Sequence, residues 1–114
     1  MRFAIFTGVI GGTLALVGCT STQEIRIKSP VATYTSAKTI LALEECLMDD
    51  VRAEYTMWGP GRQVRGEGRT AIEWGHGLNV RLLVTLTQGP PTKVEVRVSK
   101  TYPEALKRVV AACI

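Results

Sequence analysis

Residues 78–87 read LNVRLLVTLT, and this stretch decides the fold. Every second residue is apolar, namely Leu78, Val80, Leu82, Val84 and Leu86. Successive side chains of a β-strand point to opposite sides of a sheet, so this alternation predicts a strand with one buried face. A strand of this kind needs neighbours, and the flanking sequence supplies them.

Three further stretches are candidates for the same sheet. Residues 93–99 alternate valines with charged residues, and residues 69–74 place Thr70, Ile72 and Trp74 on one face and Ala71 and Glu73 on the other. Residues 54–58 form a shorter candidate strand. The connections at 75–77 and 88–92 are short and rich in glycine or proline, which favours turns and antiparallel pairing. The polar outer positions predict that one side of the sheet is wet.

Helices are expected on both sides of this strand region in the sequence. Thr35 or Ser36 can cap a helix that runs to about Arg52, and Pro103 suits the first turn of a closing helix. Both segments carry apolar residues at spacings of three and four: Ile40, Leu43, Leu47 and Val51 in the first, and Leu106, Val109, Val110 and Cys113 in the second. The sequence therefore predicts an α+β domain: an N-terminal helix, a three- to four-stranded antiparallel meander and a C-terminal helix, with both helices on one sheet face.

The amino-terminal segment has the pattern of an export signal. Arg2 precedes an apolar run from Phe3 to Val17, which is short for a membrane-spanning helix. The run ends in Leu16-Val17-Gly18-Cys19, which resembles the lipobox of bacterial lipoproteins with type II signal peptides.

The lipobox resemblance implies a lipid anchor. It implies diacylglyceryl transfer to the Cys19 sulfur, cleavage before Cys19 and acylation of the new amine, for instance by palmitate. Residues 1–18 are then the signal peptide, residues 19–33 the lipidated cysteine and a polar tether, and residues 34–114 the domain. Residues 25–28 alternate apolar and basic residues, so a short edge strand is the alternative there. By analogy with enteric lipoproteins, Thr20 after the cysteine favours the outer over the inner membrane, facing the periplasm.

Two cysteines remain once Cys19 carries lipid. Export places Cys46 and Cys113 in an oxidising compartment, so we expect a disulfide between them; two buried free thiols are the alternative. A metal site is not expected, because the chain has one histidine and no C-x-x-C motif. The mature region also resembles small uncharacterised proteobacterial envelope lipoproteins, through the stretches Leu43–Cys46 and Val110–Cys113. That resemblance supports the fold and the disulfide and implies no catalytic residues.

One glycine- and arginine-rich stretch is a candidate binding site. Residues 59–69 hold four glycines and three arginines, namely Arg62, Arg65 and Arg69. Glycine lets backbone approach a ligand and arginine grips phosphate or carboxylate, so an anion site is one hypothesis. A hairpin kept soluble by its charges is the other. His76 lies between two glycines, which suits an exposed turn rather than catalysis. The acidic residues Glu44, Glu45, Asp49 and Asp50 are expected on a solvated helix face.

These observations predict a non-enzymatic envelope lipoprotein without cofactor. Its net charge of +4, which falls to +3 once Arg2 is removed, does not indicate nucleic-acid binding in an exported protein. The expected partners are the membrane, through the anchor, and another envelope protein that docks on the wet sheet face or on an edge strand. The alternative is a module that binds anionic envelope components, such as lipopolysaccharide or peptidoglycan, through the three arginines. The sequence does not predict an oligomeric state.

Overall fold

The computed structural model describes residues 21–76 and 79–114, and side chains from residue 24 onward except that of His76. The predicted signal peptide, Cys19 and Gly77 of the predicted turn lie outside the described residues. Within the described part, no helix has the length and apolar character needed to cross a membrane.

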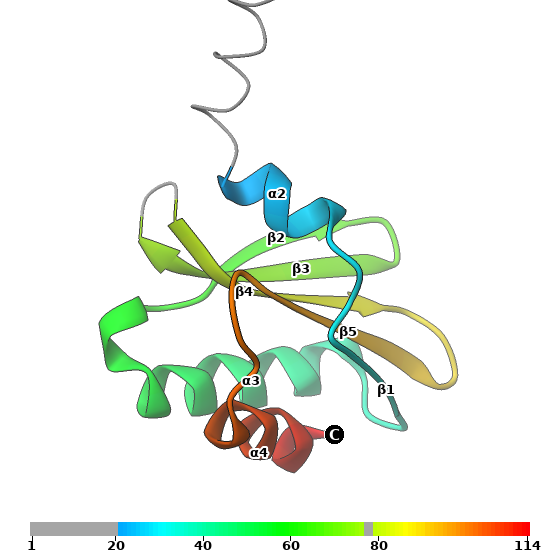
Figure 1. Cartoon of the computed structure of the whole chain (residues 1–114). Helices are drawn as coiled ribbons and strands as arrows, with labels where there is room; N and C mark the ends of the chain where they lie inside the picture. Colours follow the sequence, from blue (N-terminus) through cyan, green and yellow to red (C-terminus); the bar gives the residue numbers. More distant parts are fainter. Residues whose placement is uncertain (1–20, 77–78) are drawn as a thin grey trace, which may run out of the picture.

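The centre of the molecule is a five-stranded antiparallel sheet with the order β1-β5-β4-β3-β2 (Figure 1). Its strands are β1 (Ala32–Ser36), β2 (Arg62–Gly66), β3 (Arg69–His76), β4 (Asn79–Thr87) and β5 (Thr92–Val98). Strands β2 to β5 form a meander of sequence neighbours, so the α+β class and the meander are confirmed. The alternating stretch at residues 78–87 supplies β4, in the middle of the sheet.

Strand β1 is one of two strands that the sequence did not predict; the other is β2, which lies in the glycine- and arginine-rich stretch interpreted as a hairpin. Strand β1 pairs with β5, with Thr33 opposite Glu95 and Thr35 opposite Lys93. The segment was assigned to the tether and to the helix start, because five residues with few large apolar side chains give a weak signal. Pairing with β1 covers the open edge of β5, which is a tertiary effect that local sequence does not encode.

Two helices cover one side of the sheet, as predicted (Figure 1). Helix α3 runs over Ile40–Glu54 and helix α4 over Glu104–Cys113. The cap of α3 is Thr39, whose hydroxyl accepts a hydrogen bond from the Ala42 amide at 3.2 Å. The prediction of Thr35 or Ser36 as the cap is wrong, because both belong to β1.

The predicted strand at residues 54–58 is also wrong. Helix α3 continues to Glu54, and the short 3-10 helix η1 follows at Thr56–Trp58. The rings of Tyr55 and Trp58 stack with centroids 4.2 Å apart. Gly59, which has a φ of 74°, ends this turn and leads into β2. Aromatic residues favour strands in isolation, but here their ring contact fits a tight turn.

The main core lies between the sheet and the two helices. Leu43, Leu47 and Val51 of α3 are fully buried against the inward side chains of the sheet. The inward set comprises Ile72, Trp74, Leu82, Val84, Leu86, Val94, Val96 and Val98 and alternates along the strands. Val80, predicted on this face, packs instead with Ile25 and Leu83 on the other side, beyond a register shift in the β3–β4 pairing. Cys46 and Cys113 form the predicted disulfide, with an S–S distance of 2.02 Å, and it joins α3 to α4.

A third layer covers part of the opposite side of the sheet. Helix α2 (Ser21–Ile27) lies across that side, where the sequence predicted a tether or an edge strand (Figure 1). The Ile25 side chain is only 1% exposed and packs in a second cluster with Val80 and Leu83. We call this side the α2 face and the other the helix face. The predicted wet sheet face is therefore covered at one end.

Candidate binding surface

The three candidate arginines do not meet at one point. Arg62 lies opposite Glu73 in the β2–β3 ladder, whereas Arg65 lies opposite Thr70. Glu73 and Thr70 are three positions apart in β3, so Arg62 and Arg65 project from opposite sides of the sheet. Arg69 shares the α2 face with Arg62. One small anion therefore cannot be held by all three arginines together.

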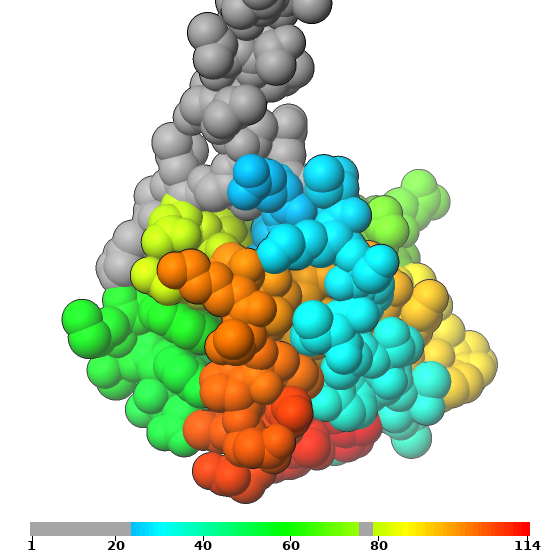
Figure 2. All heavy atoms as spheres, viewed as in Figure 1, coloured from blue at the N-terminus to red at the C-terminus, as the bar shows by residue number. Residues whose placement is uncertain are grey.

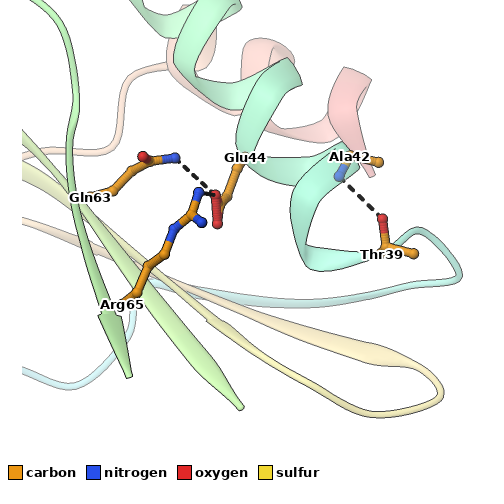
Figure 3. Close-up of polar contacts among 5 residues, drawn as sticks. All are labelled: Thr39, Ala42, Glu44, Gln63 and Arg65. Carbon is orange, nitrogen blue, oxygen red and sulfur yellow. Dashed lines mark hydrogen bonds and ion pairs between the residues drawn. The ribbon is translucent and has the colours of Figure 1, made fainter. Parts of the chain in front are cut away.

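On the helix face, Arg65 belongs to a polar cluster around the buried Glu44 of α3 (Figure 3). The Glu44 carboxylate accepts hydrogen bonds from Arg65 Nη2 at 2.9 Å and from Gln63 Nε2 at 2.8 Å. Its side chain is only 3% exposed. The expectation that Glu44 lies on a solvated face is wrong, because β2 packs under that flank of α3. This cluster ties β2 to α3 and leaves Arg65 committed to an internal partner.

On the α2 face, Glu73 has a matching role. Its carboxylate contacts Arg26 Nη2 of α2 at 2.8 Å and Arg62 Nη2 of β2 at 3.2 Å. The carboxylate is 5% exposed, whereas both arginines are largely open to solvent. A buried carboxylate is costly without partners, so these two cations hold α2 against the sheet. Beyond a glutamate at an outward strand position, nothing in the local sequence indicates this pairing.

Arg69 differs from the other two candidates. Among the residues that the structure describes, its side chain makes neither a hydrogen bond nor an ion pair. It lines a hollow of about 220 Å³ beside α2, which we call the arginine groove. The groove is lined by Arg26, Arg69, Ala71, Leu83, Thr85, Glu95 and Arg97. Glu95 lies 3.9 Å from Arg97 and 3.7 Å from Lys93, so the acid only partly offsets the cations.

The segment after α2 also binds this side of the sheet. Lys28 Nζ donates to the Ser99 carbonyl at 2.7 Å, and Arg97 Nε donates to the Lys28 carbonyl at 2.8 Å. Figure 2 shows the atoms of this segment, coloured blue to cyan, packed against the orange segment that follows β5. These contacts make α2 and its continuation a fixed part of the surface.

His76 and its neighbours form strand rather than the predicted turn. Gly75 and His76 belong to β3, and His76 pairs with Asn79. A register shift occurs between Trp74 and Gly75. Gly75 has a φ of 144°, and a Cβ there would clash with the Asn79 carbonyl oxygen, so only glycine fits. The His76 side chain is outside the description, and no role is assigned to it.

Asp50 lies beside the disulfide in a way that resembles a metal site. Its carboxylate is 3.4 Å from the Cys46 sulfur and 3.5 Å from the Cys113 sulfur. Neither sulfur carries a proton in a disulfide, so these contacts are not hydrogen bonds. Zinc requires thiolates, so this cluster is not a zinc site while the disulfide is intact.

Tyr34 and Tyr102 join β1 to the segment that precedes α4. Their hydroxyl oxygens are 2.9 Å apart and share a hydrogen bond. Burial, and then the bond to Tyr34, raise the pKa of Tyr102 well above its ordinary value of about 10. Burial also raises the pKa of Tyr55, and Glu54 adds to the shift. Raised pKa values keep both phenols neutral, which suits structural contacts.

Strands β1 and β2 are the two edges of the sheet, and β2 is the more exposed of them. All five residues of β2 are exposed, and among the described strands it pairs with β3 alone. Arg62 and Arg65 are held by Glu73 and Glu44 on the two faces, which draws their side chains away from the open edge. Such an edge presents backbone groups to another chain.

Comparison of the chain with protein-family models, with curated proteins and with solved structures gave no match. The function must therefore be argued from the residues and the geometry described above.

Proposed function

We propose that this protein is a lipid-anchored envelope protein that faces the periplasm and works by binding another envelope protein, without catalysis. The anchor is assigned to Cys19 on the strength of the lipobox-like Leu16–Cys19, with Thr20 favouring the outer membrane. Two or more acyl chains on one residue hold a protein on a membrane stably.

The geometry of α2 supports this role. Helix α2 begins at Ser21, and two residues of chain span at most about 7 Å between Cα atoms. The anchoring cysteine is therefore held close to a helix that is itself fixed to the sheet through Ile25 and Glu73. A partner would meet a domain placed at the membrane surface rather than one on a long tether.

The β2 edge is the observation that favours protein binding. A segment of a partner that pairs with β2 would extend the sheet and satisfy the open backbone groups of that edge. The exposed Val64 in the middle of β2 offers an apolar contact on the same strand. We place the partner contact there.

The test is photo-crosslinking in cells that express the full chain. A photoreactive amino acid replaces Val64, and the matched control replaces Lys107, an exposed residue of α4 on the other side of the molecule. We expect one adduct of defined mass from Val64 and none of that mass from Lys107. The same adducts from both positions, or none from any position of β2, would refute binding at this edge.

The anchor has its own test in the same cells. Metabolic labelling with a palmitate analogue should mark the full chain, and Cys19→Ser should remove the label and leave the precursor uncleaved. Label that persists in Cys19→Ser would place the acylation elsewhere.

A second function, binding of anionic envelope components, is favoured by Arg69. This arginine has no partner among the described residues and lines the arginine groove with Arg26 and Arg97. In this second function the anion binds in the arginine groove, rather than to Arg62, Arg65 and Arg69 together as the sequence predicted.

A further inference from the structure

Charge is divided between the two sides of the molecule. The α2 face, taken as α2, Lys28 and the strand residues on that side, carries six cations: Arg26, Lys28, Arg62, Arg69, Lys93 and Arg97. Its carboxylates are Glu24, Glu73 and Glu95, which leaves a net charge of +3. On the helix face, α3, α4 and Arg65 of β2 together carry six carboxylates and four cations, a net charge of −2.

An apolar side chain is exposed among these cations. Ile27 at the end of α2 is 83% exposed and lies between Arg26 and Lys28 in the sequence. Exposed apolar groups flanked by basic residues are typical of surfaces that rest on the headgroup region of a bilayer.

The described element that follows Cys19 in the sequence, α2, lies on the same side. Helix α2 and the sheet face beside it are on one side of the molecule, and α3 and α4 are on the other (Figure 1). Because Cys19 is two residues before α2, an anchor at Cys19 brings the positive side toward the bilayer and the negative side away from it. A bilayer with anionic lipids attracts each nearby lysine or arginine.

We infer that the α2 face lies flat against the headgroups of anionic phospholipids in the bilayer that holds the anchor. This inference rests on the proposed lipid anchor. Arg69 is the cation best placed to bind a phosphodiester, since guanidinium matches phosphate geometry and Arg69 has no partner among the described residues. Arg26 and Arg97 flank it in the arginine groove. When the α2 face lies on the membrane, the β2 edge stays accessible to a partner protein from the side.

The experiment reconstitutes the full-chain product, purified from membranes, into vesicles. The vesicles contain phosphatidylcholine alone or with about a quarter of phosphatidylglycerol. A photoreactive amino acid replaces Thr87, which lies between Arg69 and Lys93 on the α2 face, or Ala111, which is exposed on α4. The yield of protein–lipid adduct is measured by mass spectrometry in 0.01 M and 1 M salt, where the Debye length is about 30 Å and about 3 Å.

We expect the Thr87 adduct to increase about threefold or more with the anionic lipid in low salt, and to lose that increase in high salt. Arg69→Glu with Lys93→Glu should abolish the increase, and Arg69→Gln with Lys93→Gln should reduce it. The control Lys107→Glu with Arg108→Glu on α4 should leave it unchanged. Ala111 should give little adduct throughout.

Equal adduct yields from Thr87 and Ala111 would overturn the inference. A Thr87 yield that does not change with anionic lipid, with salt or with the charge substitutions would overturn it too. Intact mass of the same preparation reports acylation separately. An acylated protein without the Thr87 increase refutes the face contact alone. A non-acylated protein that shows the increase refutes the anchor alone.

Discussion

At the scale of single residues, Glu73 holds α2 in place. Glu73→Gln removes the charge that Arg26 and Arg62 share, while the amide keeps the shape of the side chain. Both arginines are partly solvated, so we expect a loss of about 1 kcal/mol confined to α2. Hydrogen exchange of the α2 amides should then be about five times faster, with the sheet amides unchanged.

The matched control for Glu73 is Glu95→Gln. Glu95 is on the same face, but its cation contacts are 3.7 and 3.9 Å long. Its replacement should leave α2 exchange close to that of the wild type. If Glu73→Gln also left α2 exchange unchanged, the carboxylate would not be what fixes this helix.

Gly61 tests the packing at the start of β2. A Cβ at this position would lie 2.8 Å from two ring atoms of Trp74 and 2.9 Å from Ile72 Cγ2. The Trp74 ring is buried, so it cannot move aside cheaply, and Gly61→Ala should destabilise the fold by about 1–3 kcal/mol. The free energy of unfolding, measured by urea denaturation, reports this loss.

Gly66→Ala is the control for Gly61, because the nearest atom to its Cβ would be 3.7 Å away. Its unfolding midpoint should stay near that of the wild type. Equal midpoints for the two variants would mean that the contact between Gly61 and Trp74 is not tight.

At the scale of elements, the disulfide fixes α4 to α3. The bond joins residues 67 positions apart, and constraining a loop of that length is worth about 4 kcal/mol in the chain-entropy model. Cys46→Ala with Cys113→Ala should therefore lower the melting temperature by well over 5 °C. A reducing agent should lower the melting temperature of the wild type toward that of the variant, and it should leave the melting temperature of the variant unchanged. A wild type insensitive to reduction would contradict a stabilising role.

The elements that sequence predicts are those with long, regular patterns. Strand β4 and helix α4 follow directly from spacings of two and of three to four apolar residues. Helix α2 and strand β1 have seven and five residues, and each is stabilised by contacts made far away in the chain: Ile25 with Leu83, and β1 with β5. Local pattern carries little of that information.

The candidate binding site was likewise only partly predictable from the sequence. The arginine-rich stretch was identified, but it was treated as a hairpin loop, so its three cations were expected to act together. Once β2 is known to be a strand, the odd spacing of Arg62 and Arg65 places them on opposite faces. The carboxylates that hold them, Glu73 and Glu44, could not be found without the tertiary fold.

At the scale of the whole molecule, the opposite charges of the two sides imply one orientation on the membrane. Lys93 on the α2 face and Lys107 on α4 have similar side-chain exposure, 53% and 45%. An amine-reactive reagent should modify them at comparable rates in detergent. In native membranes Lys107 should react several times faster than Lys93, as mass spectrometry of peptides would report. An unchanged ratio would contradict the orientation.

The anchor at Cys19 underlies this whole arrangement, and intact-mass analysis of the protein extracted from native membranes tests it most directly. The account predicts a chain that starts at Cys19, carries a diacylglyceryl group and an amide-linked acyl chain, and has no free thiol. A chain that keeps residues 1–18 and an unmodified Cys19 would contradict it.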